Sequence, residues 1–317
     1  MARRIPQGAV EEGVRLSEKT TLRIGGPATC CITAHRSEDL AAAVQTCREE
    51  GIPWFLLGGG SNVLFSDRGF EGVVIVAKPD GVAIAPGNRL EAASGLELMD
   101  LVRLAEARGL SGFESLAGIP GSVGGAIVGN AGAYGRNIAE LLESVELITE
   151  EGEVAWVPPD SLEFDYRESR LKRSSEVVLS ARFRLAEGDR DSISSIIRET
   201  LATRAEKHPP HDAATAGSFF KNLPPETPGG RRIAAGLILD RAGAKGMRVG
   251  DAYVFEKHAN IVVNRGHARA ADVLELTRAM KQLAFDHAGV ILEEEVRRIG
   301  FTPEELSRRA VQAPATV

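Results

Sequence analysis

The first third of the chain alternates between helical and strand-like hydrophobic patterns. Residues 37–50 predict a helix, with Ser37 expected to cap its first turn and Gly51 to end it. The apolar positions at helical spacing are Leu40, Val44 and Cys47. The apolar runs 54–57 and 72–76 predict buried strands. This alternation indicates an α/β unit whose glycines follow the carboxyl end of a strand, where such folds bind ligands.

A second unit follows with a different order of elements. A helix that stops at Gly109 has an apolar stripe formed by Leu98, Leu101, Val102 and Ala105. Residues 145–149 and 154–157 predict a hairpin, and 176–185 predict a further strand with alternating apolar positions. A helix is expected over 191–206. Its inward-facing residues are expected to be Ile193, Ile196, Ile197 and Leu201.

The proline-containing stretch 207–212 breaks that helix and is the best candidate for a domain boundary. Beyond it, the pattern predicts a compact α+β unit. Its expected elements are a strand at Phe219, a helix over 233–242, strands at Tyr253 and 260–263, a helix over 271–287 and a strand over 290–296. The tail 310–317 is expected to fray.

Composition narrows the classes of function. The chain has 317 residues and a net charge of −6, with 44 acidic and 38 basic residues, which argues against a nucleic-acid partner. Its three cysteines, Cys30, Cys31 and Cys47, are too few and too clustered for a disulfide framework and indicate a reducing cytosol. The first six residues are not followed by the apolar segment of a signal peptide, and no apolar run is long enough to cross a bilayer. We therefore expect a cytoplasmic protein that does not insert into membranes.

The first glycine-rich turn consists of Gly58, Gly59, Gly60, Ser61 and Asn62. Glycines allow backbone N–H groups to approach a pyrophosphate, and the two polar side chains add donors. No Gly-Lys-Ser/Thr follows, and Val63 occupies the last position of a G-x-G-x-x-G pattern, so neither standard phosphate-loop motif is complete. Taken alone, a tight turn at a strand exit explains the run equally well.

A second glycine-rich run is a stronger ligand signal. It contains Gly118, Gly121, Ser122, Gly124 and Gly125, and it continues into a further glycine-containing stretch over 130–135. A flexible surface loop is the alternative, but the apolar side chains interspersed with these glycines disfavour it. Those side chains are Ile119, Val123, Ile127 and Val128. The two runs together indicate a seat for a dinucleotide.

Three short segments further along the chain are candidates for catalysis. Arg167, preceded by Tyr166, has the planar fork that holds a carboxylate or a developing enolate, although a solvated surface role is the usual fate of such an arginine. Ser218 precedes two phenylalanines, which favour a partly dry setting for its hydroxyl; a hydroxyl satisfied by the backbone is the alternative. A hydrolase elbow is disfavoured, because Phe220 stands where its last glycine belongs.

The third segment is the acidic run 293–295. On a strand, Glu293 and Glu295 point one way and Glu294 the other, and a buried carboxylate of raised pKa acts as an acid. A solvated charge run is the alternative, and it applies most strongly to Glu294. Residues 208–212 contain two histidines and an aspartate, but two prolines and the lack of a further ligand argue against a metal site.

In this order, the motifs resemble the bacterial UDP-N-acetylenolpyruvoylglucosamine reductases over about residues 20–300. The strings that carry the resemblance are 21–28, 58–62, 118–125, 130–135, 166–167, 217–222, 257–260 and 295–297. Each string is modestly specific, and the ordered set is highly specific.

The resemblance implies an α+β fold: a two-part FAD-binding domain of the vanillyl-alcohol-oxidase (PCMH) type, followed by a smaller α+β substrate-binding domain. The implied bounds are 1–79 and 80–206 for the two FAD-binding subdomains, 207–300 for the substrate domain and 301–317 for a tail. It also implies non-covalent FAD, with NADPH as co-substrate and a UDP-sugar as substrate.

By motif position, Ser218 matches the family's proton donor, and Arg167 and Glu295 match the pair that steadies the enol intermediate. Tyr166, Lys207 and Asn222 match positions that contact the UDP-sugar. These assignments make chemical sense, because hydride addition drives negative charge toward the carboxylate, where a fixed cation and an acid are most useful.

The chain departs from the family at Leu223, where proline is usual, which affects the local turn and not the chemistry. The spacing from Arg167 to Ser218 indicates the compact second branch of the family. Two alternatives stay open: another flavin oxidase or dehydrogenase of the same fold that acts on a small alcohol or sugar, and a non-catalytic sensor of nucleotide-sugars or dinucleotides.

Overall fold

A computed structural model describes residues 10–227 and 229–307, which form two compact units. Unit 1 comprises residues 10–12, 30–59 and 72–204; unit 2 comprises 13–29, 60–71, 205–227 and 229–307. The expectations for the first six residues and for the tail 310–317 lie outside the described residues. Segments 13–29 and 60–71 thus group with unit 2, although the predicted bounds place them in the first subdomain. Those bounds stay a prediction.

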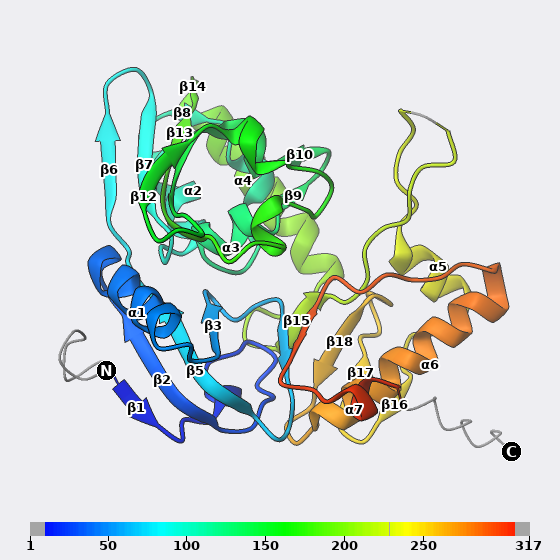
Figure 1. Ribbon diagram of the computed structural model, residues 1–317. Helices are drawn as coiled ribbons and strands as arrows, with labels where there is room; N and C mark the ends of the chain where they lie inside the picture. Colours follow the sequence, from blue (N-terminus) through cyan, green and yellow to red (C-terminus); the bar gives the residue numbers. More distant parts are fainter. Residues whose placement is uncertain (1–9, 228, 308–317) are drawn as a thin grey trace, which may run out of the picture. The chain divides into compact units, whose positions relative to one another are not determined.

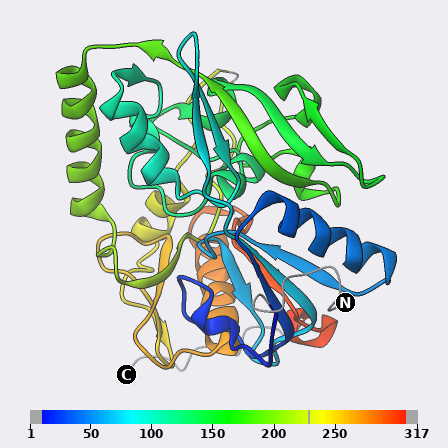
Figure 2. The same ribbon diagram turned by 90° about the vertical axis from the view of Figure 1, so that its left-hand side faces the viewer.

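The first sheet of unit 1 is covered by one helix. Its strand order is β1-β2-β5-β3, with bounds Val10–Glu12, Ala28–Ala34, Phe70–Ala77 and Trp54–Leu57. Helix α1 (Ser37–Glu49) lies along these strands (Figure 1; Figure 2). Its buried Leu40, Val44 and Cys47 pack with apolar side chains of β2 and β5 in one cluster. The predicted helix and both predicted strands of this segment are confirmed, and β3 and β5 are parallel.

The second sheet of unit 1 is antiparallel throughout. Its order is β12-β11-β13-β7-β6, with bounds Val154–Val157, Leu142–Ile148, Val177–Arg184, Arg89–Ala93 and Val82–Ala85. One face buries an apolar core against α2 (Leu98–Ala107), α3 (Val123–Val128) and α4 (Arg190–Lys207). The opposite face has Arg–Glu pairs such as Arg182–Glu91 at 2.8 Å. That face is only partly solvated, because Ile148, Val177 and Leu179 on it pack in the cluster that contains α1.

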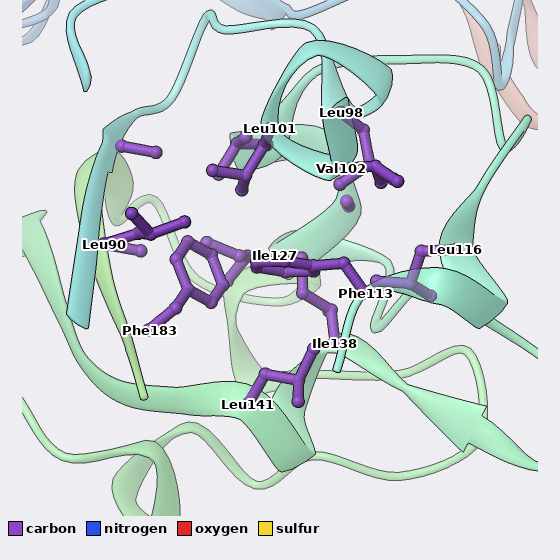
Figure 3. Close-up of a cluster of buried hydrophobic side chains, with 14 of the residues drawn as sticks. Leu90, Leu98, Leu101, Val102, Phe113, Leu116, Ile127, Ile138, Leu141 and Phe183 are labelled. Atoms are coloured by element: carbon purple, nitrogen blue, oxygen red, sulfur yellow. The ribbon is translucent and has the colours of Figure 1, made fainter. Parts of the chain in front are cut away.

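Figure 3 shows the centre of this core, where Phe113 and Phe183 meet edge to face with ring centroids 5.1 Å apart.

The shorter strands of unit 1 form two ribbons, β8 (Leu110–Ser111) with β14 (Ala186–Glu187) and β9 (Gly132–Ala133) with β10 (Arg136–Asn137). Short 3-10 helices lie at Leu16–Glu18, Glu114–Leu116, Ile138–Leu141, Pro159–Leu162 and Arg170–Lys172.

Unit 2 contains the mixed helices and strands predicted beyond residue 207, together with segments 13–29 and 60–71. Its antiparallel sheet has the order β15-β18-β17-β16, with bounds Ala214–Ser218, Ile261–Asn264, Ala252–Val254 and Arg248–Val249. Helices α5 (Ala235–Arg241) and α6 (Ala270–Ala288) contribute to its apolar cluster (Figure 1). A parallel pair, β4 (Val63–Phe65) with β19 (Arg297–Ile299), and the short helix α7 (Pro303–Ser307) complete the described part.

Specific contacts tie the early segments of the chain to unit 2. The Asp67 carboxylate accepts hydrogen bonds from the N–H groups of Ala270 and Ala271, at 2.8 and 3.1 Å, where α6 begins. The buried Asn264 amide donates to the Leu22 carbonyl at 3.2 Å. These bonds satisfy backbone groups that would otherwise be buried without a partner, so the two segments are integral to this unit.

Four details of the sequence-based prediction are wrong. Helix α1 is capped by the backbone of Arg36, because Ser37 already has helical geometry. Ile196 is 48% exposed, since only Ile193 and Ile197 of that turn face the core. The strand expected at Phe219 ends at Ser218, and residues 290–296 form no strand; a strand begins only at Arg297, beside β4.

Candidate active site

Gly58 and Gly59 of the first glycine-rich turn lie directly against the second turn, within unit 1. A Cβ placed on Gly58 would lie 2.5 Å from the Ser122 hydroxyl oxygen, and one on Gly59 would lie 2.8 Å from the Gly121 Cα. Neither distance is tolerated by a real side chain. Gly59 is therefore required by the approach of the second turn's backbone, and Gly58 by the Ser122 side chain; a tight turn formed by a single run does not explain these contacts.

The second turn leads into α3, a helix the sequence pattern did not reveal. Ser122 caps it, accepting a hydrogen bond from the Gly125 N–H at 3.3 Å. Gly124 packs so closely on Ser94 that a Cβ would lie 2.8 Å from the Ser94 Cβ, and its N–H donates to the Ser94 carbonyl at 2.8 Å. The signal for this helix was the serine followed by an apolar run, but its glycines concealed it.

These turns fit a dinucleotide. Within residues 10–227 and 229–307, the backbone N–H groups of Gly59 and Gly121 donate to no protein acceptor, and the buried Ser94 hydroxyl has no hydrogen-bond partner. Exposed peptide N–H groups on a side-chain-free surface are the arrangement that binds a pyrophosphate. The assignment of these glycines, Ser122, Ser61 and Asn62 to FAD binding stays a prediction.

Arg167 joins the third glycine stretch, also within unit 1. It lies in a tight turn closed by reciprocal hydrogen bonds of 3.1 Å between the backbones of Asp165 and Glu168, and its own φ is +57°. Its guanidinium donates to the carbonyls of Gly132 at 2.7 Å and Asn130 at 3.4 Å. A left-handed backbone at a non-glycine residue is strained and is retained where the surroundings hold it. Tyr166 lies beside it, its ring centroid 5.4 Å from the Arg167 Cζ.

Sequence reasoning missed Arg204, in the last turn of α4. Its Nε lies 3.0 Å from the Cβ that a side chain at Gly118 would carry. Burial lowers the pKa of its guanidinium, Tyr134 partly offsets this, and the charge of Arg167 lowers the pKa further. Among the described residues no acidic side chain pairs with Arg204. A partly buried cation in that state favours an anionic ligand.

In unit 2, Ser218 ends strand β15 directly after a bulge. The pairing of β15 with β18 shifts between Thr215 and Ser218, and Gly217 has a φ of +74°. The Thr215 hydroxyl stabilises the bulge, since it accepts from the Gly217 N–H at 3.2 Å and donates to the Val262 carbonyl at 2.8 Å. Bulges of this kind re-aim a side chain.

Glu295 lies next to this segment. Its N–H donates to the Phe219 carbonyl at 2.9 Å, and the Lys221 N–H donates to the Glu293 carbonyl at 2.8 Å, so Phe220 and Glu294 face each other in a bridge. The Asn62 amide donates to the Glu295 carbonyl at 3.2 Å. The structure thus brings Ser218 and Glu295 into one neighbourhood of unit 2, and joins the last residue of the first glycine turn to it.

The acidic run is not a strand, so the predicted alternation of its three side chains stays untested, although Glu293 and Glu294 differ in exposure. Glu293 is exposed and pairs with Lys221, whereas Glu294 pairs with Lys281 at 2.6 Å and with Arg298. The Glu294 side chain is only 12% exposed, so the expectation that it is the most solvated member is wrong. Its partners lie on α6 and β19, which the sequence alone did not place beside it.

The remaining predicted residues are found at the ends of elements. Lys207 is the last residue of α4. The Asn222 side-chain oxygen accepts from the Ala235 N–H at 3.2 Å, where α5 begins. Arg167 and Tyr166 belong to unit 1, while Ser218, Glu295, Lys207 and Asn222 belong to unit 2. Convergence of all of them on one ligand stays a prediction.

The described residues also bear on metal sites and membrane spans. Within them, no group of three or more His, Cys, Asp or Glu side chains is placed to hold a metal ion. None of the described helices combines the length and the apolar character needed to span a membrane.

Comparison with known proteins shows similarity over nearly the whole chain. Residues 28–158 match a family model described as an FAD binding domain, and residues 208–299 match the C-terminal domain of UDP-N-acetylenolpyruvoylglucosamine reductase. Proteins of that name from Heliobacterium modesticaldum and Syntrophus aciditrophicus are 40% and 38% identical to this chain. The alignments cover 90% and 92% of this chain and 89% and 93% of the relatives.

A solved structure is also similar. The crystal structure of UDP-N-acetylenolpyruvylglucosamine reductase from Thermus caldophilus aligns with a TM-score of 0.76 at 36% identity, covering 92% of this chain and 98% of that one.

Proposed function

This chain belongs to the UDP-N-acetylenolpyruvoylglucosamine reductase family, and on that basis we propose that it reduces UDP-N-acetylglucosamine enolpyruvate to UDP-N-acetylmuramate. The reaction uses FAD and consumes NADPH, and it serves peptidoglycan precursor synthesis. An FAD-binding domain followed by a smaller α+β domain is the fold class expected from the sequence, and the family matches confirm it.

The observation that carries the catalytic assignment is the pairing of residues 219–221 with 293–295. The Glu295 N–H reaches the Phe219 carbonyl at 2.9 Å, so two residues remote in sequence, Ser218 and Glu295, lie on adjacent backbones. A dinucleotide sensor would not require a hydroxyl and a carboxylate to be held together beside the end of a glycine turn.

FAD, when bound, would supply the redox chemistry that links NADPH oxidation to reduction of the enolpyruvyl group. The residues of the chain supply the rest. Ser218 donates the proton to C2, and Arg167 with Glu295 stabilises the negative charge that develops toward the carboxylate. Tyr166, Lys207 and Asn222 bind the UDP-sugar.

The setting of the reaction follows from its small-molecule substrates. Neither nucleic acid nor a membrane takes part in it, and the net charge of −6 suits that reading. Among the described residues, Cys30, Cys31 and Cys47 form no disulfide, as the reducing cytoplasm favours. We place the enzyme there, and in the compact second branch of its family.

The test separates the two halves of the reaction. The purified protein is expected to be yellow, and Ser218→Ala is expected to leave flavin reduction by NADPH unchanged under anaerobic conditions. Reoxidation of the reduced flavin by the enolpyruvyl substrate should slow by about 10²–10⁴-fold, the usual contribution of a general acid. Ser192→Ala, at an exposed position of α4, is the control and should match the wild type in both halves.

Other outcomes identify the alternatives. A colourless protein that binds UDP-sugars would be a sensor. A yellow protein whose reduced flavin is reoxidised by oxygen but not by the enolpyruvyl substrate would be an oxidase of the same fold.

A further inference from the structure

The side chain of Asn260 forms two hydrogen bonds with the backbone of Phe220, one to its N–H and one to its carbonyl. Asn260 lies in the loop between β17 and β18 and is only 2% exposed. Its Oδ1 accepts from the Phe220 N–H at 2.9 Å, and its Nδ2 donates to the Phe220 carbonyl at 2.8 Å. A buried amide that exchanges two hydrogen bonds with one residue fixes the position and orientation of that residue.

Asn260 is itself fixed. Its carbonyl accepts from the Phe219 N–H at 2.8 Å, and its own N–H donates to the His258 Nδ1 at 3.3 Å. The loop that contains it is closed by a 2.9 Å hydrogen bond from the Phe255 N–H to the Ile261 carbonyl. Asn260 is therefore held in place by its own hydrogen bonds while it bonds to residues 219–220.

Ser218 lies between this contact and the bulge. On its N-terminal side, the Thr215 hydroxyl stabilises the Gly217 turn; on its C-terminal side, three hydrogen bonds join Asn260 to Phe219 and Phe220. The backbone of Ser218 is thus constrained at both ends. The direction of its Cα–Cβ bond follows from that backbone, and so does the place its hydroxyl can reach.

We propose that Asn260 is a positioning residue for proton delivery by Ser218. This inference rests on the proposed function, in which Ser218 is the proton donor. Asparagine suits the task because the Phe220 residue presents one donor and one acceptor to it, and an amide answers both at once. An ionised aspartate has only acceptors, so it cannot donate to the Phe220 carbonyl, and its oxygen is repelled by the carbonyl oxygen.

The experiment compares Asn260→Asp with wild-type holoenzyme in the two half-reactions. Flavin reduction by NADPH should be unchanged. Reoxidation by the enolpyruvyl substrate should slow by about 10–100-fold at pH 8, the cost of displacing a catalytic group by a fraction of an ångström to an ångström. The dissociation constant for the UDP-sugar, measured by calorimetry, should change much less than this rate.

A pH series distinguishes positioning from general damage. Burial raises the pKa of the carboxyl introduced by Asn260→Asp, and its protonated form can donate to the Phe220 carbonyl while accepting from the Phe220 N–H. The rate deficit relative to wild type should therefore shrink as the pH falls from 8 to 6. A deficit that is constant with pH would contradict the proposal.

The matched control is Asn264→Asp, which changes a similarly buried asparagine at the end of β18. Asn264 bonds to residues 22, 23, 266 and 268, and not to residues 218–221. It should lower the melting temperature while leaving the reoxidation rate per bound flavin near the wild-type value. An equal slowing in both variants would mean general loss of packing and would overturn the proposal.

Should Asn260→Asp fail to fold, Asn260→Ser keeps a neutral hydroxyl and is expected to show the same split with a smaller deficit. No slowing in any folded variant at position 260 overturns the inference. If Ser218→Ala itself leaves reoxidation unaffected, the proton-donor assignment fails first, so the two failures are distinguishable.

Discussion

The glycine turns of unit 1 and the surroundings of Ser218 in unit 2 prepare for ligands in opposite ways. In unit 1, side chains are removed: Gly59 and Gly121 approach so closely that no Cβ fits between them. In unit 2, side chains fix the backbone instead, since the Asn260 amide and the Thr215 hydroxyl form hydrogen bonds with the backbone on either side of Ser218. A surface of bare peptide suits a cofactor that binds throughout the reaction, whereas proton transfer requires a fixed donor.

The difference predicts unequal sensitivity to small substitutions. In unit 1 the addition of a single carbon should be enough to abolish function. In unit 2 the damage should come from the loss of a hydrogen bond or an ion pair.

The largest effect is expected from Gly59→Ala. The new methyl group would meet backbone atoms of residues 121 and 122, which cannot move as a flexible side chain can. We expect a stability loss of about 1–3 kcal/mol and a protein that loses most of its flavin. Flavin absorbance per protein and the melting temperature measure these changes. Gly81→Ala is the control, because a Cβ there meets no atom within 4 Å; flavin loss in both variants would remove the contrast between the units.

Next is Glu294→Gln in unit 2, which is expected to lower stability without loss of flavin. This change removes the charge that pairs with both Lys281 and Arg298 in a largely buried setting, so we expect a loss of about 2–3 kcal/mol of unfolding free energy. Urea denaturation measures it. The neighbouring Glu293→Gln removes a largely exposed charge and should cost about 0–1 kcal/mol. Equal losses would show that burial does not distinguish these two carboxylates.

A loss of stability of similar or smaller size is expected at alkaline pH from Cys47 in unit 1. Burial raises the pKa of the Cys47 thiol from 9.0 to about 11, with a smaller contribution from Cys30. The folded state therefore keeps its proton where the unfolded chain has lost it. Stability due to this thiol is complete below pH 9 and decreases as the pH rises toward 11, by up to about 2 kcal/mol.

Thermal unfolding between pH 8 and 11 tests this, with Cys47→Ala as the comparison. The variant is less stable overall, but its melting temperature should fall less steeply with pH. Parallel curves would rule out a contribution from Cys47.

The smallest effect is expected from Asp67→Ala. The carboxylate accepts from two N–H groups at the start of α6, and removal of such a cap costs about 1 kcal/mol. The exposed Asp80→Ala in unit 1 should be neutral by the same denaturation measurement. A neutral Asp67→Ala would mean that segment 60–71 does not stabilise unit 2 through this contact.

Much of this protein was open to prediction from local pattern. Helix α1, helix α2 and the β11–β12 hairpin follow from hydrophobic spacing and turn residues, because those elements bury one stripe or one face. The ordered motifs also indicated the family, which the comparisons confirm. Errors arose where long-range contacts override local signals, as at 290–296, which pairs only at single positions before β19 joins β4.

The sequence by itself determined where the glycines, the serine and the acidic run stand, and it identified their chemistry, since those depend on residue type and spacing. Only the tertiary structure decided that Gly59 touches Gly121, that Glu294 rather than Glu293 is the buried carboxylate, and that Asn260 holds the residues after Ser218. The Gly59–Gly121 and Asn260–Phe220 contacts join segments dozens of residues apart, and the partners of Glu294 lie on two other elements, α6 and β19. Such pairings are selected by the packing of the whole unit, and no local pattern encodes them.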